Sequence, residues 1–317
     1  MSEIGKNIEK AAQLLGSGKL VAIPTETVYG LAANALNAKA VASVFEAKKR
    51  PFFDPLIMHS YSTEQTLQYV SSIPAPLKQL AHAFWPGPLT LLLPKKSNIP
   101  DLVTAGLQTV AVRIPNHKLT LELLEKLDFP LAAPSANPFG YISPTTAEHV
   151  NKQLANEVSY ILDGGNCSVG IESTIVGMEE EKVCVYRLGG LAIDDIEKVV
   201  GKVELKINVS GDPTAPGQLK SHYAPTKKLI LGNMQGLLKQ YEGKRIGVLT
   251  FGKIDVKQTV VINLSEKGDM KEAAANLFSA LRILDESDVD FIISEHVPNV
   301  GLGSAINDRL NRAAFNP

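Results

Sequence analysis

The chain has 317 residues, of which 44% are hydrophobic and 21% charged. This length predicts about two domains, and the composition excludes a disordered chain or a collagen-like fibre. The 32 Lys and Arg nearly cancel the 33 Asp and Glu, giving a net charge of -1. Near-neutrality argues against a protein that coats nucleic acid by bulk charge, because such binding needs many cations on one face.

The two cysteines, Cys167 and Cys184, are too few for a disulfide framework and lack the close spacing of a four-ligand zinc site. This usage indicates a reducing compartment. Residues 1–19 carry scattered charges and no apolar core of signal-peptide length. The longest apolar runs fall far short of the roughly 20 residues that cross a bilayer. We therefore expect a cytoplasmic protein without membrane association.

Helical and extended patterns alternate along residues 1–206. Apolar residues at helical spacing predict helices, and short apolar or β-branched runs predict strands. In chain order the patterns predict a helix at 4–15, a strand at 20–24, a helix at 38–49, a strand at 55–59, a helix at 76–84, strands at 89–93 and 109–114, a helix at 118–127, a strand at 131–133, a helix at 146–154, and strands at 160–162, 173–176 and 183–187. Because strands both alternate with helices and follow one another, we interpret this region as one α/β domain with a mixed twisted sheet.

The composition changes at 207–227, where Ser, Gly, Pro and Asp replace the apolar pattern. We interpret this stretch as an interdomain linker, because its prolines fix the backbone and no periodicity remains. Residues 228–317 then predict strands at 229–231, 245–250 and 260–264, a helix at 270–284, a strand at 291–294 and a helix at 304–314. Strand, helix and strand at short intervals predict a small Rossmann-like α/β domain with a parallel sheet.

Common nucleotide and hydrolase motifs are missing from the sequence. It has no GxxxxGK[ST] phosphate loop, no HExxH pair and no GxSxG nucleophile elbow. Gly301-Leu302-Gly303 lacks the third glycine of a dinucleotide fingerprint, and we interpret it as a tight turn before a helix. A nucleotide, if bound, must be held in another way.

Two early segments concentrate residue types that can bind anions. Residues 24–31 run from a strand end into a turn that offers two hydroxyls, a carboxylate and a phenol, although a simple capped turn would use the same residues. Lys48-Lys49-Arg50-Pro51 is a basic cluster at the end of a predicted helix. Cations are favoured at a helix C-terminus in any case, but Lys and Arg together also suit a polyphosphate.

Later segments of the same domain add similar groups. Arg113 ends an otherwise apolar strand, so it must bind an anion, form a structural ion pair or reach solvent. Residues 133–138 and 143–146 carry small polar side chains that could cap a helix or bind an anion at its start. Glu172-Ser173-Thr174 and Arg187 follow. Because no nucleophile-base pair accompanies them, these segments predict a site that positions anions rather than one that attacks through a side chain.

The chain resembles the L-threonylcarbamoyladenylate synthases in their long, two-domain form. The signature of their YrdC-like domain is matched, in order, by PTETVYGL at 24–31, Lys48-x-Arg50-Pro51, Pro55-Leu56-Ile57-x-His59, Ser135-x-Asn137, Ser143-Pro144-Thr145 and Glu172-Ser173-Thr174. The linker and C-terminal helix of the long form are matched by Pro216-Gly217, His222-Tyr223-Ala224-Pro225, Ala305-Ile306 and Asp308-Arg309-Leu310-x-Arg312-Ala313-Ala314.

The resemblance implies a nucleotidyltransferase that makes L-threonylcarbamoyladenylate and pyrophosphate from L-threonine, bicarbonate and ATP with Mg²⁺. The product would feed, through downstream tRNA threonylcarbamoyl-transferase proteins, the modification of the adenosine next to the anticodon, and this chain would bind tRNA at most weakly. The alternative is a non-catalytic RNA-binding module of the same fold. Strong salt dependence of tRNA affinity would distinguish it.

The resemblance also implies roles for individual residues. The catalytic residues would be Lys48 and Arg50, and the linker at 207–227 would act as a lid. L-Threonine would be bound by Thr27, His59, Arg113, Ala133 and Ser173. ATP would be bound by Lys48, Arg50, Asp54, Thr109, Ser135, Asn137, Ser143, Arg187, His222 and Tyr223. The metal ligands stay open.

Overall fold

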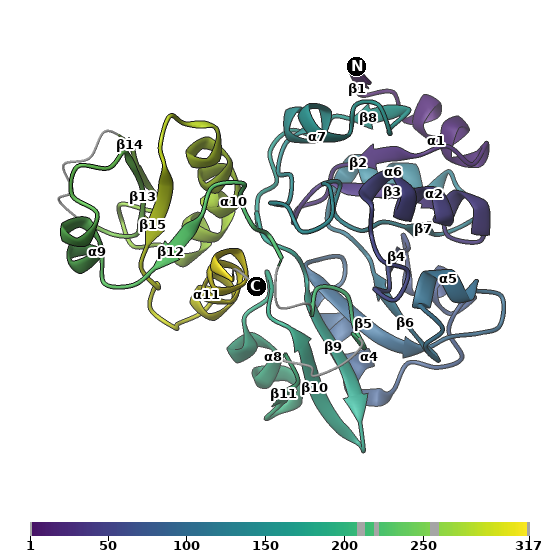
Figure 1. Ribbon diagram of the computed structural model, residues 1–317. Coiled ribbons are helices and arrows are strands. Elements are labelled where there is room, and N and C mark those ends of the chain that lie inside the picture. Colours follow the sequence, from purple (N-terminus) through teal and green to yellow (C-terminus); the bar gives the residue numbers. More distant parts are fainter. Residues whose placement is uncertain (1, 208–212, 219–221, 254–259, 316–317) are drawn as a thin grey trace.

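The computed structural model describes residues 2–207, 213–218, 222–253 and 260–315, and Figure 1 shows two bodies of α/β structure. Among the described residues, eleven strands form the first sheet, in the spatial order β1-β8-β2-β3-β7-β4-β6-β5-β9-β10-β11. These strands are β1 (Glu3–Gly5), β2 (Val21–Ile23), β3 (Gly30–Asn34), β4 (Ile57–His59), β5 (Leu89–Pro94), β6 (Thr109–Arg113), β7 (Leu131–Ala132), β8 (Tyr160–Leu162), β9 (Thr174–Glu179), β10 (Lys182–Arg187) and β11 (Glu204–Leu205). The predicted mixed sheet is confirmed, since β4 and β6 run parallel whereas β5 and β6 run antiparallel.

Helices cover this sheet and bury its apolar side chains. They are α1 (Ile8–Gly16), α2 (Ala38–Lys48), α3 (Thr63–Thr66), α4 (Ala75–Phe84), α5 (Asp101–Thr104), α6 (Lys118–Glu125), α7 (Ala147–Leu154) and α8 (Ile193–Val200). The side chain of Asn37 accepts hydrogen bonds from the N–H groups of Lys39 and Ala40 and so caps the start of α2. The helix ends at Lys49, whose left-handed φ of 53° turns the chain toward Arg50.

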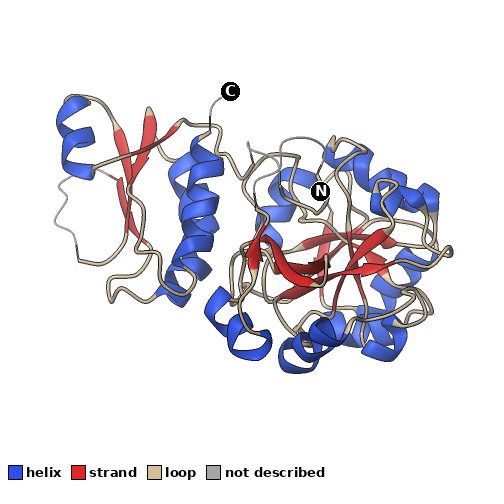
Figure 2. Cartoon of the chain, turned by 90° about the horizontal axis from the view of Figure 1, so that it is seen from below, coloured by secondary structure: helices blue, strands red, loops and turns tan. Residues whose placement is uncertain are grey.

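The second sheet is smaller and parallel, as expected. Its described strands, in the spatial order β12-β15-β13-β14, are β12 (Leu229–Leu231), β13 (Ile246–Thr250), β14 (Val260–Asn263) and β15 (Phe291–Ser294). Its helices are α9 (Met234–Gln240), α10 (Met270–Glu286) and α11 (Gly303–Ala314). Figures 1 and 2 show that α9 covers one face of this sheet, while α10 lies on the other face, toward the first sheet.

The C-terminal unit, residues 229–253 and 260–315, packs closely on the first. At Gly170, an added Cβ would lie 2.4 Å from the Cα of Ala275 in α10, so only glycine permits this approach. Tyr223 stacks on Phe278 of the same helix with ring centroids 5.4 Å apart. The C-terminal unit therefore contacts the first unit at Gly170, next to residues 171–173, and at Tyr223.

The structure differs from the sequence prediction at several elements. Residues 3–5 form strand β1, because they pair with Tyr160–Leu162 of β8, so the helix predicted at 4–15 begins only at Ile8. The short elements β3, α3, α5, α8, β11 and α9 were not predicted. Part of the proposed linker, residues 208–212 and 219–221, lies outside the described residues. Among the described residues, no helix is long and apolar enough to cross a membrane.

Candidate active site

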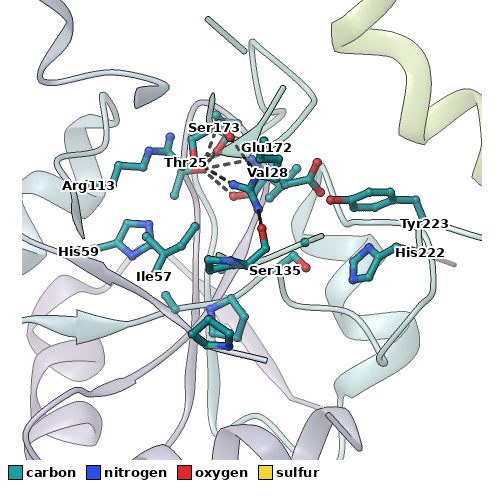
Figure 3. A pocket seen from close by; sticks show the side chains of 18 of the residues that line it. Thr25, Val28, Ile57, His59, Arg113, Ser135, Glu172, Ser173, His222 and Tyr223 are labelled. Atoms are coloured by element: carbon teal, nitrogen blue, oxygen red, sulfur yellow. Dashed lines mark hydrogen bonds between the residues drawn. The ribbon is translucent and has the colours of Figure 1, made fainter. Parts of the chain in front are cut away.

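One cavity lies where the ends of several strands of the first sheet meet (Figure 3). About 560 Å³ of empty space, part of it open to solvent, lies between its walls. In Figure 3, His59 and Arg113 lie on one side and His222 and Tyr223 on the other. The lining residues are Thr25, Thr27, Val28, Gly30, Arg50, Pro55, Ile57, His59, Arg113, Ala133, Pro134, Ser135, Glu172, Ser173, Arg187, Pro216, Gly217, His222 and Tyr223.

Arg113 is held on the cavity wall by three partners. It ends β6 and lies beside His59 of β4 in the parallel register. Its Nη1 donates to the hydroxyl of Thr27 at 2.7 Å, its Nε donates to the carbonyl of Gly87 at 3.2 Å, and its Nη2 lies 2.7 Å from a carboxylate oxygen of Glu26. A guanidinium has five N–H groups, so Nη1 and Nη2 each keep one N–H beyond these contacts.

The turn after β2 brings Thr27 to Arg113. Thr25 Oγ1 donates to the carbonyl of Val28 at 2.6 Å and accepts from the N–H groups of Thr27 and Val28 at 3.1 and 3.2 Å. These hydrogen bonds give main-chain groups of the turn partners within the turn itself, so they need none from a neighbouring strand. The two interpretations of residues 24–31, a capped turn and a cluster of functional groups, therefore describe the same structure.

His59 is a buried, neutral imidazole on the wall. Burial, together with the nearby charge of Arg113, lowers the pKa of His59 to about 3. Its Nδ1 has no hydrogen-bond partner among the described residues. Because a buried polar atom without a partner is costly, this nitrogen is well suited to bind a polar group of a ligand.

Ser173 and Arg187 form a second polar cluster. The Ser173 hydroxyl lies 2.7 Å from that of Thr90 and accepts from Nη2 of Arg187 at 3.0 Å. Arg187 also donates through Nε to the Ser173 carbonyl at 3.0 Å and through Nη1 to the Pro216 carbonyl at 3.3 Å. The hydroxyls of Thr27 and Ser173 thus bind arginines rather than a general base, which suits ligand binding more than nucleophilic attack.

Arg50 reaches the cavity from the loop after α2. Its Nη2 donates to the Pro55 carbonyl at 2.9 Å and lies 2.9 Å from the carboxylate of Asp54. Asp54 itself is fully buried and does not line the cavity. Burial raises the pKa of Asp54, although Arg50 and Lys48 oppose this shift. Asp54 therefore holds Arg50 from behind the cavity wall.

Residues between the two sheets close the cavity. His222 and Tyr223 line it, and the N–H of His222 donates to the carbonyl of Arg312 at 3.4 Å. Burial, with Arg50 as the largest charge effect, lowers the pKa of His222, and burial raises that of Tyr223 to about 12. Both side chains are therefore neutral near pH 7.

Five of the predicted ATP-binding residues do not line the cavity: Lys48, Asp54, Thr109, Asn137 and Ser143. Lys48 Nζ donates to the carbonyl of Ser135 at 2.5 Å and to that of Asn137, so it holds this loop from behind. Burial, and after it the charge of Arg50, lowers the pKa of Lys48. The amide of Asn137 donates to the carbonyls of Pro138 and Tyr141.

Thr109 lies at the opposite end of β6 from Arg113. Alternate residues of a strand share a face, so Thr109, Ala111 and Arg113 lie on the same side of the sheet. Ala111 packs in one apolar cluster with Ile57 and Ala215. Ala215 is therefore part of the apolar packing next to Ala111, the residue between Thr109 and Arg113 on this face.

Two carboxylates of the site were not predicted as site residues. Glu172 lines the cavity, and Glu26 pairs with Arg113 behind the wall. Both belong to motifs recognised in the sequence, but nothing in the spacing shows that they face buried arginines. The described residues contain no cluster of three or more His, Cys, Asp or Glu that could hold a metal.

Two family models together match almost the whole chain. The family described as "Telomere recombination" matches residues 13–189. The family described as "Threonylcarbamoyl-AMP synthase, C-terminal domain" matches residues 191–315. The first match alone covers more than half of the chain.

Similar proteins have been described and solved. The threonylcarbamoyl-AMP synthases of Pyrococcus abyssi and Bacillus subtilis are each 42% identical to this chain, covering 97% of it and 94% and 92% of their own lengths. The crystal structure of P. abyssi Sua5 complexed with L-threonine matches with a TM-score of 0.92 at 40% identity, over 99% of this chain and 97% of that one. The chain belongs to the threonylcarbamoyl-AMP synthase family, in its long two-domain form.

Proposed function

We propose that this chain is a nucleotidyltransferase that makes L-threonylcarbamoyladenylate and pyrophosphate from L-threonine, bicarbonate and ATP. The observation that carries the proposal is that Thr27, His59 and Arg113 share one cavity with Arg50 and Arg187. The first group suits an amino acid, and the second suits phosphates. The relationship to a P. abyssi protein crystallised with L-threonine supports it.

L-Threonine would bind between His59, Thr27, Ser173 and the main chain at Ala133. The remaining N–H groups on Nη1 and Nη2 of Arg113 form a fork for its carboxylate. The unpartnered Nδ1 of His59 would bind the amine or hydroxyl of the substrate. Recognition of the methyl group predicts a modest preference for threonine over serine, since one methyl is worth about 1–3 kcal/mol. Equal use of valine would show that the hydroxyl is not recognised.

ATP would place its phosphates against Arg50, Arg187 and Ser135. Its base would extend over the sheet face toward Thr109, beside the apolar cluster of Ile57, Ala111 and Ala215. His222 and Tyr223 would cover the bound nucleotide. Four residues behind the wall would support ATP binding indirectly, by holding the segments that contact the nucleotide. They are Lys48, Asp54, Asn137 and Ser143.

The reaction needs no covalent enzyme intermediate. The threonine amine condenses with bicarbonate to form a carbamate, and the amine proton leaves with the bicarbonate hydroxyl as water. A carbamate oxygen then attacks the α-phosphorus as pyrophosphate leaves. The arginines would hold the reactants in line and stabilise the charge that develops on the phosphate oxygens. Mg²⁺ bound to the triphosphate would supply further positive charge.

Mass spectrometry after omission of each component tests this proposal. The chain is incubated with ATP-Mg²⁺, L-threonine and bicarbonate, and then with each left out in turn. We expect threonylcarbamoyl-AMP only in the complete mixture and without added RNA. Strongly salt-dependent tRNA binding without product would instead favour the RNA-binding alternative. We further propose that the product is consumed by a tRNA threonylcarbamoyl-transferase in the cytoplasm.

A further inference from the structure

Arg309 of α11 reaches from the C-terminal unit to the wall of the cavity without lining it. Its side chain is fully buried, and its Nε donates to Oε2 of Glu172 at 2.9 Å. Its Nη1 lies 2.8 Å from Asp308, and its guanidinium lies 5.0 Å from the ring centroid of Tyr223. One side chain thus contacts both a wall carboxylate and a residue that covers the cavity.

Glu172 is fixed from two directions. While Oε2 accepts from Arg309, Oε1 accepts from the hydroxyl of Ser143 at 2.6 Å. Glu172 immediately precedes Ser173, which binds Arg187. The carboxylate is therefore held next to the polar cluster of Ser173 and Arg187.

The charge of Glu172 opposes the proposed substrate. A carboxylate on the wall of a cavity that takes a triphosphate repels it, and the repulsion is strong where water is excluded. Burial would lower the pKa of Arg309, but its interactions with Tyr223, Glu172 and Asp308 together raise it above its ordinary value. Arg309 thus stays charged and compensates Glu172.

We propose that Arg309 is a positioning residue for the reaction, which neutralises Glu172 on the cavity wall and holds Tyr223 over the nucleotide. This inference rests on the proposed function. It gives the C-terminal unit a defined contribution to the site, namely one buried cation that the first unit does not supply at this point.

A double-mutant cycle with ATP as the varied substrate tests the role. Full-length Arg309→Met is expected to lower kcat/KM for ATP at least about 30-fold, mainly through KM, because Glu172 is left buried and unpaired. Glu172→Gln removes that charge, so the Arg309→Met/Glu172→Gln double variant should recover about tenfold or more of the loss. Pyrophosphate release reports the rates, and thermal unfolding shows that each variant is folded.

Arg282 provides a matched control. It is also a buried arginine of the C-terminal unit, stacks over Tyr141 and binds the first unit, but through the carbonyls of Ile142 and Ser143 and the amide of Gln153. Any loss in Arg282→Met should not be rescued by Glu172→Gln, because Arg282 forms no ion pair with Glu172 and is linked to it only through the main chain of Ser143.

The outcomes separate the alternatives. Activity of Arg309→Met within threefold of the wild type, or equal rescue of both arginine variants by Glu172→Gln, would overturn the inference. If Arg309→Met does not fold, Arg309→Lys serves as the second variant, because lysine keeps the positive charge. Adding Glu172→Gln to Arg309→Lys should then lower activity. A gain in activity would also overturn the inference. Absence of threonine-dependent pyrophosphate release in the wild type would overturn the proposed function itself.

Discussion

The guanidinium of Arg113 lies 2.7 Å from the carboxylate of Glu26, and both side chains are buried. Glu26 stands behind Arg113 rather than in the cavity. The pair therefore fixes the plane of the guanidinium while part of its N–H fork stays free for a ligand. A substrate carboxylate can bind without a large rearrangement of the arginine.

Replacement of either partner should affect threonine use to different extents. Arg113→Met removes the proposed carboxylate ligand and should raise the KM for threonine about 100-fold, as expected for loss of a buried charged contact. Glu26→Gln keeps the arginine but loosens its orientation, so we expect a smaller rise. Pyrophosphate release at varied threonine measures both, and a larger effect of Glu26→Gln than of Arg113→Met would contradict this assignment.

Arg50→Ala should lower turnover by on the order of 100-fold or more, because the guanidinium is proposed to act on charge that develops at the phosphates. Lys48→Ala should have a similar effect through the loop that it holds. Asp54→Asn should raise the KM for ATP by a smaller factor, since Arg50 is kept but loses the carboxylate that holds it. Steady-state kinetics decide, and near-normal turnover in both cation variants would remove the phosphate-clamp hypothesis.

The low pKa of His59 predicts a pH dependence of stability. In the unfolded chain His59 binds a proton below about pH 6.5, whereas burial and Arg113 delay protonation in the folded chain to about pH 3. Well above pH 6.5 His59 is unprotonated in both the folded and the unfolded chain, so it does not change the free energy of unfolding there. As pH falls, the unfolded state gains the proton first and the free energy of unfolding decreases, by about 2 kcal/mol at pH 5 from this group.

Urea unfolding at pH 7 and pH 5 checks this prediction. The wild type should lose more stability between the two values than His59→Gln, which has no such group to protonate. Equal losses in the two proteins would show that His59 is not the group responsible.

Gly189→Ala should destabilise the protein and disturb the site. An added Cβ would lie 2.3 Å from the carbonyl oxygen of Glu172 and 2.4 Å from the carbonyl carbon of Ser173. Main-chain atoms cannot easily move aside, so we expect a loss of about 1–3 kcal/mol or more, together with lower activity. Gly16→Ala, where an added Cβ meets nothing within 4 Å, is the control and should change stability by less than about 0.5 kcal/mol. Chemical denaturation measures both.

The sequence predicted most elements with strong local patterns. The strands at 160–162, 229–231 and 291–294 have the predicted bounds, because a short apolar run between polar turns allows few other structures. Strand β1 was missed because residues 3–5 become a strand only by pairing with β8, a contact more than 150 residues away in the chain. Such pairing leaves no periodic signal in three residues.

The sequence by itself determined the fold class, the two sheets and the family, since each follows from local periodicity or from motifs in a fixed order. Only the tertiary structure decided which motif residues line the cavity. Lys48 and Arg50 are neighbours in one motif, yet Arg50 lines the cavity while the ammonium of Lys48 binds carbonyls behind its wall. Glu172 and Arg309 are 137 residues apart, yet they form a buried pair. Local sequence fixes which groups are available, but their partners depend on how distant strands and helices pack, because burial and charge pairing act between groups that are close in space.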